Sequence, residues 1–266
     1  MLDQTQRYIL DPKQPGYDDQ IQLFRTQFAK EGALVLPGFV SAANLKTMVS
    51  ESLALSERAF HNFETSTIFL ESPDPALPED HVKRMVDHSK IHVIANDQIP
   101  DCSKLRELYL HQHLTSFIRD VAGVPSLYRY GCPLGALNYQ LMKDGDGVRW
   151  HYDISDFVAA IPIQDADQGG AFEYVHNLRL TDNSSCDLAR SYLKEQAGQA
   201  SILESPLGSL VLFRGRNTLH RVTKILGDKP RINALLGYAT KPGHNSSNFV
   251  KMMRYGRLQV IRPDES

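Results

Sequence analysis

The chain has 266 residues, 42% of them hydrophobic and 23% charged, values that fit a globular protein with a sizeable core. Its net charge is −2, with no long run of like charge, which excludes the basic surface of a typical nucleic-acid-binding protein. Because no signal-peptide core and no stretch of ~18 apolar residues is present, we expect no membrane partner.

The cysteines indicate a reducing compartment. Cys102, Cys132 and Cys186 are far apart, odd in number and without the CxxC spacing of a zinc ribbon. A disulfide framework is therefore not expected, and the sequence predicts a cytoplasmic protein with free thiols.

The N-terminal part, residues 1–127, is predicted to be mainly helical. Apolar residues at helical spacing, an N-capping serine and terminal glycines define its elements. We expect a helix from Asp18 to Gly32, a strand at 33–36, a helix from Ser41 to about Leu55, and a helix over 104–122 that ends at Gly123.

Residues 56–103 lack a clear period and are interrupted by Pro73, Pro75 and Pro78. A long irregular segment in a compact domain is often a functional loop, so we interpret it as lid-like, with a plain surface excursion as the alternative. His88 and His92 are spaced to share a helix face, but nothing in the sequence completes a second metal site. They are interpreted as surface histidines.

From Tyr128 the pattern changes to short strands separated by glycine and proline turns. Strands are predicted at 136–142, 148–153, 157–163, 169–175, 200–203, 209–213, 219–224 and 231–239, with a helical insertion at 181–197. The fold class is therefore mainly β with flanking helices, and residues 128–243 form a double-stranded β-helix (jelly-roll or cupin-like) core. No linker divides the chain, so we expect one domain over residues 1–266.

The candidate metal ligands begin with His151 and Asp153. On an extended strand, residues i and i+2 project to the same face, so this imidazole and carboxylate converge on one point. His220, just beyond a later apolar strand, is the candidate third ligand. Two imidazoles and one carboxylate suit iron(II), but zinc would also accept them. The alternative is a solvated turn followed by a histidine of the core.

Arg231 precedes the apolar run 232–236, so its side chain is expected to face the interior. A buried guanidinium needs an anion, and a carboxylate that accepts two hydrogen bonds is its best partner.

Five motifs together resemble the iron(II)/2-oxoglutarate-dependent oxygenases, and more narrowly the branch of free-amino-acid radical halogenases and related hydroxylases. They are the segments 151–157, 169–175, 212–216, 219–223 and 230–231. The resemblance implies that His151, Asp153 and His220 bind Fe(II), and that Arg231 binds the distal carboxylate of 2-oxoglutarate. Dioxygen would be the second cosubstrate.

The resemblance also bears on the reaction. Halogenases of this branch have a small residue in place of the carboxylate ligand, which leaves a coordination position for chloride. Asp153 occupies that position here, so the resemblance favours hydroxylation of an unactivated C–H bond. A halogenase or desaturase on the same scaffold, and a non-catalytic metal-binding jelly roll, are the alternatives.

The branch suggests a small polar substrate such as a free amino acid. Candidate substrate-binding residues are Arg84 in the lid-like segment, Arg214 near His220, and Asp156, which could meet an ammonium group. Tyr139, on a strand leading to the metal motif, is a candidate for a hydrogen bond to the cosubstrate. Trp150 directly precedes His151 on the strand, so its side chain points to the opposite face and is expected in the core. A homodimer is left open.

Overall fold

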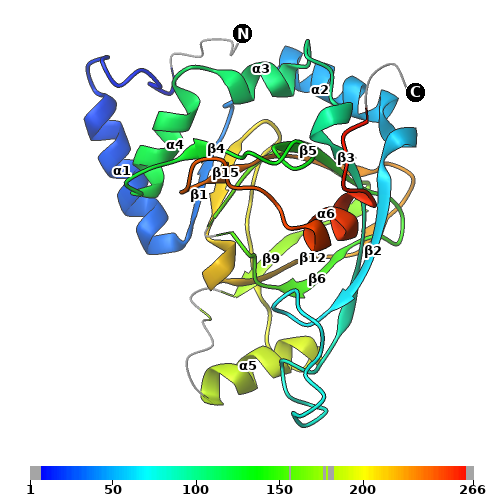
Figure 1. The fold of residues 1–266 in the computed structure, drawn as a ribbon. Helices are drawn as coiled ribbons and strands as arrows, with labels where there is room; N and C mark the ends of the chain where they lie inside the picture. The colour runs from blue at the N-terminus through cyan, green and yellow to red at the C-terminus, as the bar shows by residue number, and fades with distance from the viewer. Residues whose placement is uncertain (1–6, 156, 176–177, 179–182, 262–266) are drawn as a thin grey trace.

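Two antiparallel β-sheets form the centre of the computed structural model, which describes residues 7–155, 157–175, 178 and 183–261 (Figure 1). The larger sheet has the strand order β1 (Ala33–Leu36), β11 (Leu210–Phe213), β7 (Val158–Gln164), β14 (Arg231–Leu236), β5 (Leu137–Met142), β3 (Asp87–Ala95), β2 (Phe60–Ser66). The smaller sheet has the order β10 (Ser201–Ile202), β9 (Phe172–Val175), β12 (Leu219–Val222), β6 (Val148–His151). Two short pairs accompany them: β13 (Ile225–Leu226) with β8 (Gln168–Gly169), and β15 (Tyr238–Ala239) with β4 (Tyr128–Arg129).

Four helices gather on one side of the larger sheet (Figure 1): α1 (Tyr17–Glu31), α2 (Ala42–Ala54), α3 (Lys104–Leu110) and α4 (Leu114–Ala122). Their apolar residues and one face of the sheet share the largest buried cluster of the protein. Helix α5 (Asn183–Leu193) packs near the smaller sheet, and α6 (Asn248–Tyr255) contacts β2 and β3. Short 3₁₀ helices lie at Ser56–Arg58 (η1), Asn96–Gln98 (η2) and Gly215–Asn217 (η3).

The helix ends follow the signals in the sequence. Ser41 caps α2, since its Oγ accepts a hydrogen bond from the Asn44 N–H, and Gly32 ends α1 with φ 68°. The predicted helix over 104–122 is wrong in one respect: it is two helices, and His111 leaves helical geometry between them. Gly123 ends the second helix, as expected.

Successive side chains of β14 point alternately into the helix-side core and into a cavity on the other face of the sheet. Ile232, Ala234 and Leu236 lie in the helix-side core, whereas Arg231, Asn233 and Leu235 line a pocket on the other face. Strand β5 repeats this arrangement, with Gln140 and Met142 on the pocket side. The pocket is also lined by strands of the smaller sheet, so it lies between the two sheets.

The lid-like interpretation of 56–103 is wrong for much of that segment. Strands β2 and β3 form an antiparallel pair that extends the larger sheet, and only the connection between them holds the three prolines. The inward positions of β2 are polar (Asn62, Glu64 and Ser66), so the strand lacks the apolar alternation that would have predicted it.

The strands of the core also extend beyond the predicted range 128–243, because β1, β2 and β3 come from the N-terminal part. Among the described residues, no helix has the length and apolar character needed to cross a membrane.

Candidate metal centre

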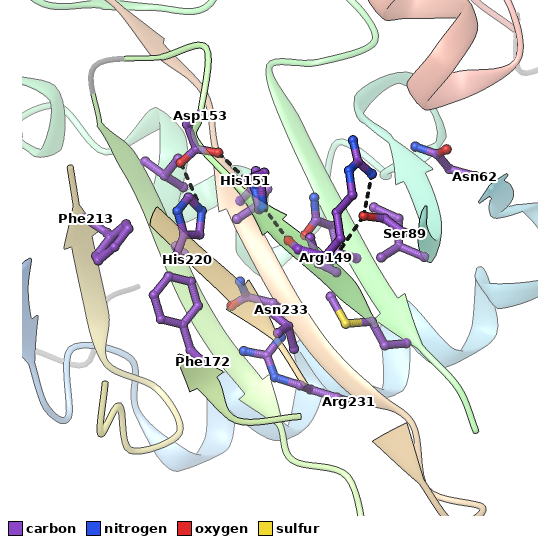
Figure 2. Close-up of a pocket in the computed structure, with 18 of the residues that line it drawn as sticks. Asn62, Ser89, Arg149, His151, Asp153, Phe172, Phe213, His220, Arg231 and Asn233 are labelled. Atoms are coloured by element: carbon purple, nitrogen blue, oxygen red, sulfur yellow. Dashed lines mark hydrogen bonds and ion pairs between the residues drawn. The ribbon is translucent and has the colours of Figure 1, made fainter. Parts of the chain in front are cut away.

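His151 and His220 are direct partners across two strands. The first ends β6 and the second lies in β12, and the register of the smaller sheet places them opposite each other. Their ring centroids are 4.2 Å apart, and Figure 2 shows both rings near the carboxylate of Asp153. Phe172 stacks on the His220 ring and Phe213 meets it edge-on, which restricts the ring's rotation.

Both imidazoles are held in the same tautomer by carbonyl groups. The Nδ1 of His151 lies 2.9 Å from the Arg149 carbonyl oxygen, and the Nδ1 of His220 lies 2.9 Å from that of Thr218. A carbonyl can only accept, so each Nδ1 carries the proton and each Nε2 keeps a free lone pair. Protein ligands of metals are commonly oriented in this way.

Asp153 completes the set from a turn rather than from the strand. Its backbone N–H donates to the Gly215 carbonyl at 3.1 Å, and β6 has already ended at His151. One carboxylate oxygen lies 3.4 Å from His151 Nε2 and the other 3.5 Å from His220 Nε2. The three groups converge as predicted, but the i, i+2 strand geometry is not the cause.

The electrostatics of the three groups fit a bound cation. Burial opposes the charged form of Asp153, but His220 and His151 beside it lower the pKa of its carboxyl to about 2. Burial lowers the pKa of His220 to about 4, with His151 adding to the effect. The site therefore presents a carboxylate and the Nε2 atoms of two imidazoles to one point. Such a donor set suits a divalent metal, and its nitrogen and oxygen atoms suit iron(II) or zinc.

Arg231 lies in the same cavity, on β14 (Figure 2). Burial lowers the pKa of its guanidinium, while Asp165 acts in the opposite direction. Within the described part of the chain, the Arg231 side chain forms no hydrogen bond or ion pair of its own. Asn233, two residues along the strand, has a buried side-chain oxygen that accepts no hydrogen bond from the described residues. A guanidinium in such a position can donate two hydrogen bonds to a carboxylate.

Gly170 makes room for Arg231. An added Cβ at residue 170 would lie 2.8 Å from the Arg231 Cδ and would push the side chain aside. The backbone of Gly170 also has φ +71°, a conformation that favours glycine.

A polar wall that the sequence analysis missed lies on another side of the cavity. Arg149 is buried, and its guanidinium contacts the Glu64 carboxylate at 2.9 Å, Ser89 Oγ at 2.7 Å and Ser66 Oγ. Its Nε has no partner in the described structure. Arg149 precedes His151 by two residues on the same strand, so the alternation that relates side chains on one face could have identified it.

Arg254 of α6 is a second residue that the sequence analysis missed. Its half-buried side chain lines the cavity and adds positive charge near Asp153. It has no hydrogen bond or ion pair with the residues that the structure describes. Nothing in the sequence around Arg254 indicated this position, because α6 lies after the last predicted strand.

The structure does not bring Tyr139 to the cavity. The tyrosine lies in the helix-side core, where its hydroxyl donates to Glu51 Oε1 at 2.7 Å. Its neighbours Gln140 and Met142 face the other way and line the pocket. The predicted cosubstrate contact is therefore corrected: Tyr139 joins α2 to the sheet.

The candidate substrate residues Arg84 and Arg214 also lie away from the cavity. Arg84 donates to the carbonyls of Pro75 and Leu77, and so holds together the connection between β2 and β3. The guanidinium of Arg214 lies 4.8 Å from the ring centroid of Phe28, against α1. Neither residue lines the pocket. Asp156 lies outside the described residues. Trp150 is buried on the far side of β6, as expected.

A comparison with protein families identifies the chain. The family model HalD, described as Halogenase D, matches residues 17–254, which is most of the sequence. The chain belongs to the Halogenase D family. The match includes all three candidate metal ligands, Arg231 and Arg254.

Solved structures share the fold of this Halogenase D family member. The epimerase SnoN from nogalamycin biosynthesis, in complex with Fe³⁺, α-ketoglutarate and nogalamycin RO, is 15% identical, with 92% of this chain and 94% of that chain covered and a TM-score of 0.55. HygX from Streptomyces hygroscopicus, with nickel, 2-oxoglutarate and hygromycin B bound, is 14% identical over 82% and 86% of the chains, with a TM-score of 0.54.

A 2OG-Fe(II) oxygenase family protein from Burkholderia pseudomallei is 14% identical over 85% of this chain and 93% of that chain, with a TM-score of 0.52. These neighbours have the double-stranded β-helix fold, so the predicted fold class is confirmed. A comparison with curated proteins finds no match.

Proposed function

We propose that this chain is an iron(II)- and 2-oxoglutarate-dependent dioxygenase that hydroxylates an unactivated C–H bond of a small polar substrate, with a free amino acid as the leading class. The observation that carries the proposal is the position of Asp153. Its carboxylate meets both histidine Nε2 atoms within 3.5 Å, in the same cavity as Arg231, which has no hydrogen bond or ion pair with the described residues.

Each part of the cavity has a role in this proposal. His151, Asp153 and His220 would hold Fe(II). Arg231 would bind the distal carboxylate of 2-oxoglutarate through two parallel hydrogen bonds. When bound, iron and 2-oxoglutarate would supply the activation of dioxygen that attack on a C–H bond requires. The apolar side chains of Phe172, Phe213 and Val222 would limit the access of water.

The polar wall supports a substrate with charged groups. Arg254 is a second cavity guanidinium without a partner among the described residues, so we assign it to a substrate carboxylate. Glu64 and Asn62 supply acceptors on the Arg149 side, where an ammonium or hydroxyl group would bind. These residues replace Arg84 and Arg214 as candidate substrate contacts.

The test is a screen of free amino acids with the iron-loaded enzyme and 2-oxoglutarate, in which succinate release and product mass are measured. We expect succinate and a product heavier by one oxygen atom for at least one substrate. Asp153→Ala should abolish the product, whereas Asp101→Ala, at an exposed carboxylate, should not. Full activity of the Asp153 variant, or tight zinc binding with no succinate in the whole screen, would exclude this function.

Halogenation is the second candidate because the matching family is described as Halogenase D. Halogenases of the branch that the sequence resembles have a small residue where this chain has Asp153, which argues against a chloride ligand. The same screen with added chloride distinguishes the two reactions. A product in which chlorine replaces hydrogen would make the wild-type protein a halogenase, and loss of two hydrogen atoms would make it a desaturase.

A further inference from the structure

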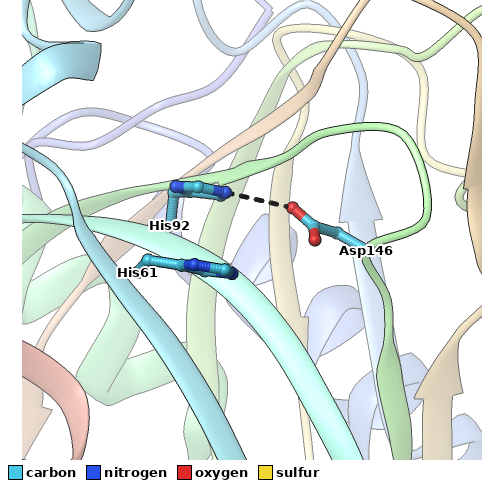
Figure 3. Close-up of side chains that lie close together, drawn as sticks. All are labelled: His61, His92 and Asp146. Carbon is cyan, nitrogen blue, oxygen red and sulfur yellow. Dashed lines mark ion pairs between the residues drawn. The ribbon is translucent and has the colours of Figure 1, made fainter.

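A second group of metal-ligating side chains lies outside the catalytic cavity. His61 of β2 and His92 of β3 are direct partners across the strand pair, and their rings stack with centroids 4.3 Å apart and an interplanar angle of 2°. Asp146 approaches from the turn between β5 and β6, with Oδ2 3.4 Å from His92 Nε2. Figure 3 shows both rings directing a nitrogen toward this carboxylate. One ligand atom from each residue lies within 4.8 Å of the others.

The turn holds the Asp146 carboxylate in place. Its Oδ2 accepts the Lys143 N–H at 2.9 Å, and the Asp146 carbonyl accepts the Ile225 N–H at 2.8 Å. The side chain is only 4% exposed, whereas His61 is open to solvent. The buried carboxylate has further lone pairs with which it can bind a metal ion. The exposed imidazole of His61 lets such an ion reach the carboxylate from solution.

The cluster lies on the face of the larger sheet that is opposite the cavity. On β2, His61 alternates with Asn62, which lines the cavity, and on β3, His92 alternates with Ile91, which does the same. Neither histidine lines the cavity, and Asp146 does not either. The two groups of ligands are thus separate sites that share strands.

We propose that His61, His92 and Asp146 form a second metal site that binds a divalent transition metal such as zinc. Two imidazoles and a carboxylate, with water as a fourth ligand, suit zinc, whereas calcium and magnesium prefer oxygen ligands alone. Lys90 and Lys143 add positive charge near His92, which further disfavours ions that bind by charge alone. The site therefore selects metals that bond to nitrogen.

A metal here connects three parts of the chain. It would join β2, β3 and the turn that leads into β6, the strand with Arg149 and His151. Lys90 and Gly147 already form a bridge between β3 and this turn. Binding to the folded state alone stabilises a protein in proportion to the logarithm of the metal concentration. The ion would therefore act as a structural clamp behind the polar wall of the cavity.

The experiment uses the full chain with the catalytic site removed by His151→Ala and His220→Ala. Zn²⁺ is titrated into this variant, and the zinc content per chain is measured after gel filtration. We expect one equivalent of zinc and a rise in the unfolding temperature. Adding His61→Ala, at an exposed position, should abolish both, and adding His88→Ala, a histidine of β3 outside the cluster, should abolish neither.

Asp146→Asn provides an independent check. It keeps an oxygen that can accept the Lys143 N–H but removes the charge that a metal requires. In the same variant without the catalytic histidines, we expect a folded protein that no longer binds this equivalent of zinc. The proposal is overturned if the variant without catalytic histidines binds no zinc, or if the zinc persists after His61→Ala or Asp146→Asn.

Discussion

Gly215 lies directly against the carboxylate of Asp153. A Cβ added at residue 215 would overlap the Asp153 Oδ2 atom and would lie 2.9 Å from its Cβ. The Gly215 carbonyl also accepts the Asp153 N–H. The position of the Asp153 carboxylate therefore depends on the absence of a side chain at residue 215, which is 62 positions later in the chain (215 − 153). Glycine is needed here for a close approach, and its backbone does not adopt a left-handed conformation.

Gly215→Ala should weaken iron binding because Asp153 must move. The effects of residues that orient a metal ligand are roughly 10–100-fold in metal affinity, and we expect a loss in this range. Anaerobic titration with Fe(II) measures it. Gly198→Ala is the matched control, since an added Cβ there meets no atom within 4 Å. Equal iron affinity of the two variants would show that Asp153 is not held by Gly215.

Arg231→Lys should raise the KM for 2-oxoglutarate more than it changes the KM for the substrate. Lysine keeps the charge but loses the planar pair of donors, and hydrogen bonds to charged groups contribute about 1.5–3 kcal/mol each. A loss of about 10-fold or more in apparent affinity follows from one such bond. The measurement is succinate formation at varied 2-oxoglutarate concentrations.

Arg254→Gln is the control for Arg231, and it should have the opposite selectivity. If Arg254 binds the substrate, the KM for the substrate rises and that for 2-oxoglutarate stays near the wild-type value. If both variants changed the same KM, the assignment of the two guanidinium groups to two different carboxylates would be wrong.

The sequence predicted the parts of this structure that depend on local chemistry. The ends of α1, α2 and α4 followed from Gly32, Ser41 and Gly123, and short apolar runs between glycine and proline turns located the strands of the jelly roll. The candidate ligands His151, Asp153 and His220 were predicted from their types and spacing together with the family resemblance, and the structure places their side chains close together. Local sequence patterns are sufficient to predict a helix or strand where one face of that element is apolar.

The parts that the sequence did not predict are polar or depend on distant segments. Strand β2 presents polar side chains to the cavity, so it lacked an apolar period. In β3 the apolar alternation is confined to the second half of the strand, from Ile91 onward. His61 and His92 are paired by strand register over 31 residues, which no local spacing reveals (92 − 61). Arg84 was chosen because it lies in the lid-like segment, and Arg214 because it is near His220 in the sequence. Side-chain direction, however, decides which arginine enters a cavity.

Arg149→Met should destabilise the fold strongly. The Arg149 side chain is 1% exposed and pairs with Glu64, so its removal leaves a carboxylate that is 14% exposed without its cation. Breaking a buried ion pair from one side costs about 3–5 kcal/mol. Urea unfolding measures the free energy, provided that the transition is two-state.

Two further variants separate this loss from a general effect of removing a charge. Lys104→Met breaks an exposed pair with Glu107, and such pairs contribute about 0–1 kcal/mol. Arg149→Met combined with Glu64→Leu removes both charges and should recover part of the lost stability. A single variant as stable as the wild type would mean that the pair does not stabilise the polar wall.

Tyr139→Phe tests whether the Tyr139 hydroxyl stabilises the fold or binds the cosubstrate. Its hydroxyl and that of Ser103 both donate to Glu51 Oε1, at 2.7 and 2.6 Å, in the contact between α2, α3 and the sheet. Loss of one such bond should cost about 1–3 kcal/mol in the free energy of unfolding. Because Gln140 and Met142, not Tyr139, line the cavity, the KM for 2-oxoglutarate should stay unchanged. A raised KM with unchanged stability would instead place Tyr139 at the cosubstrate.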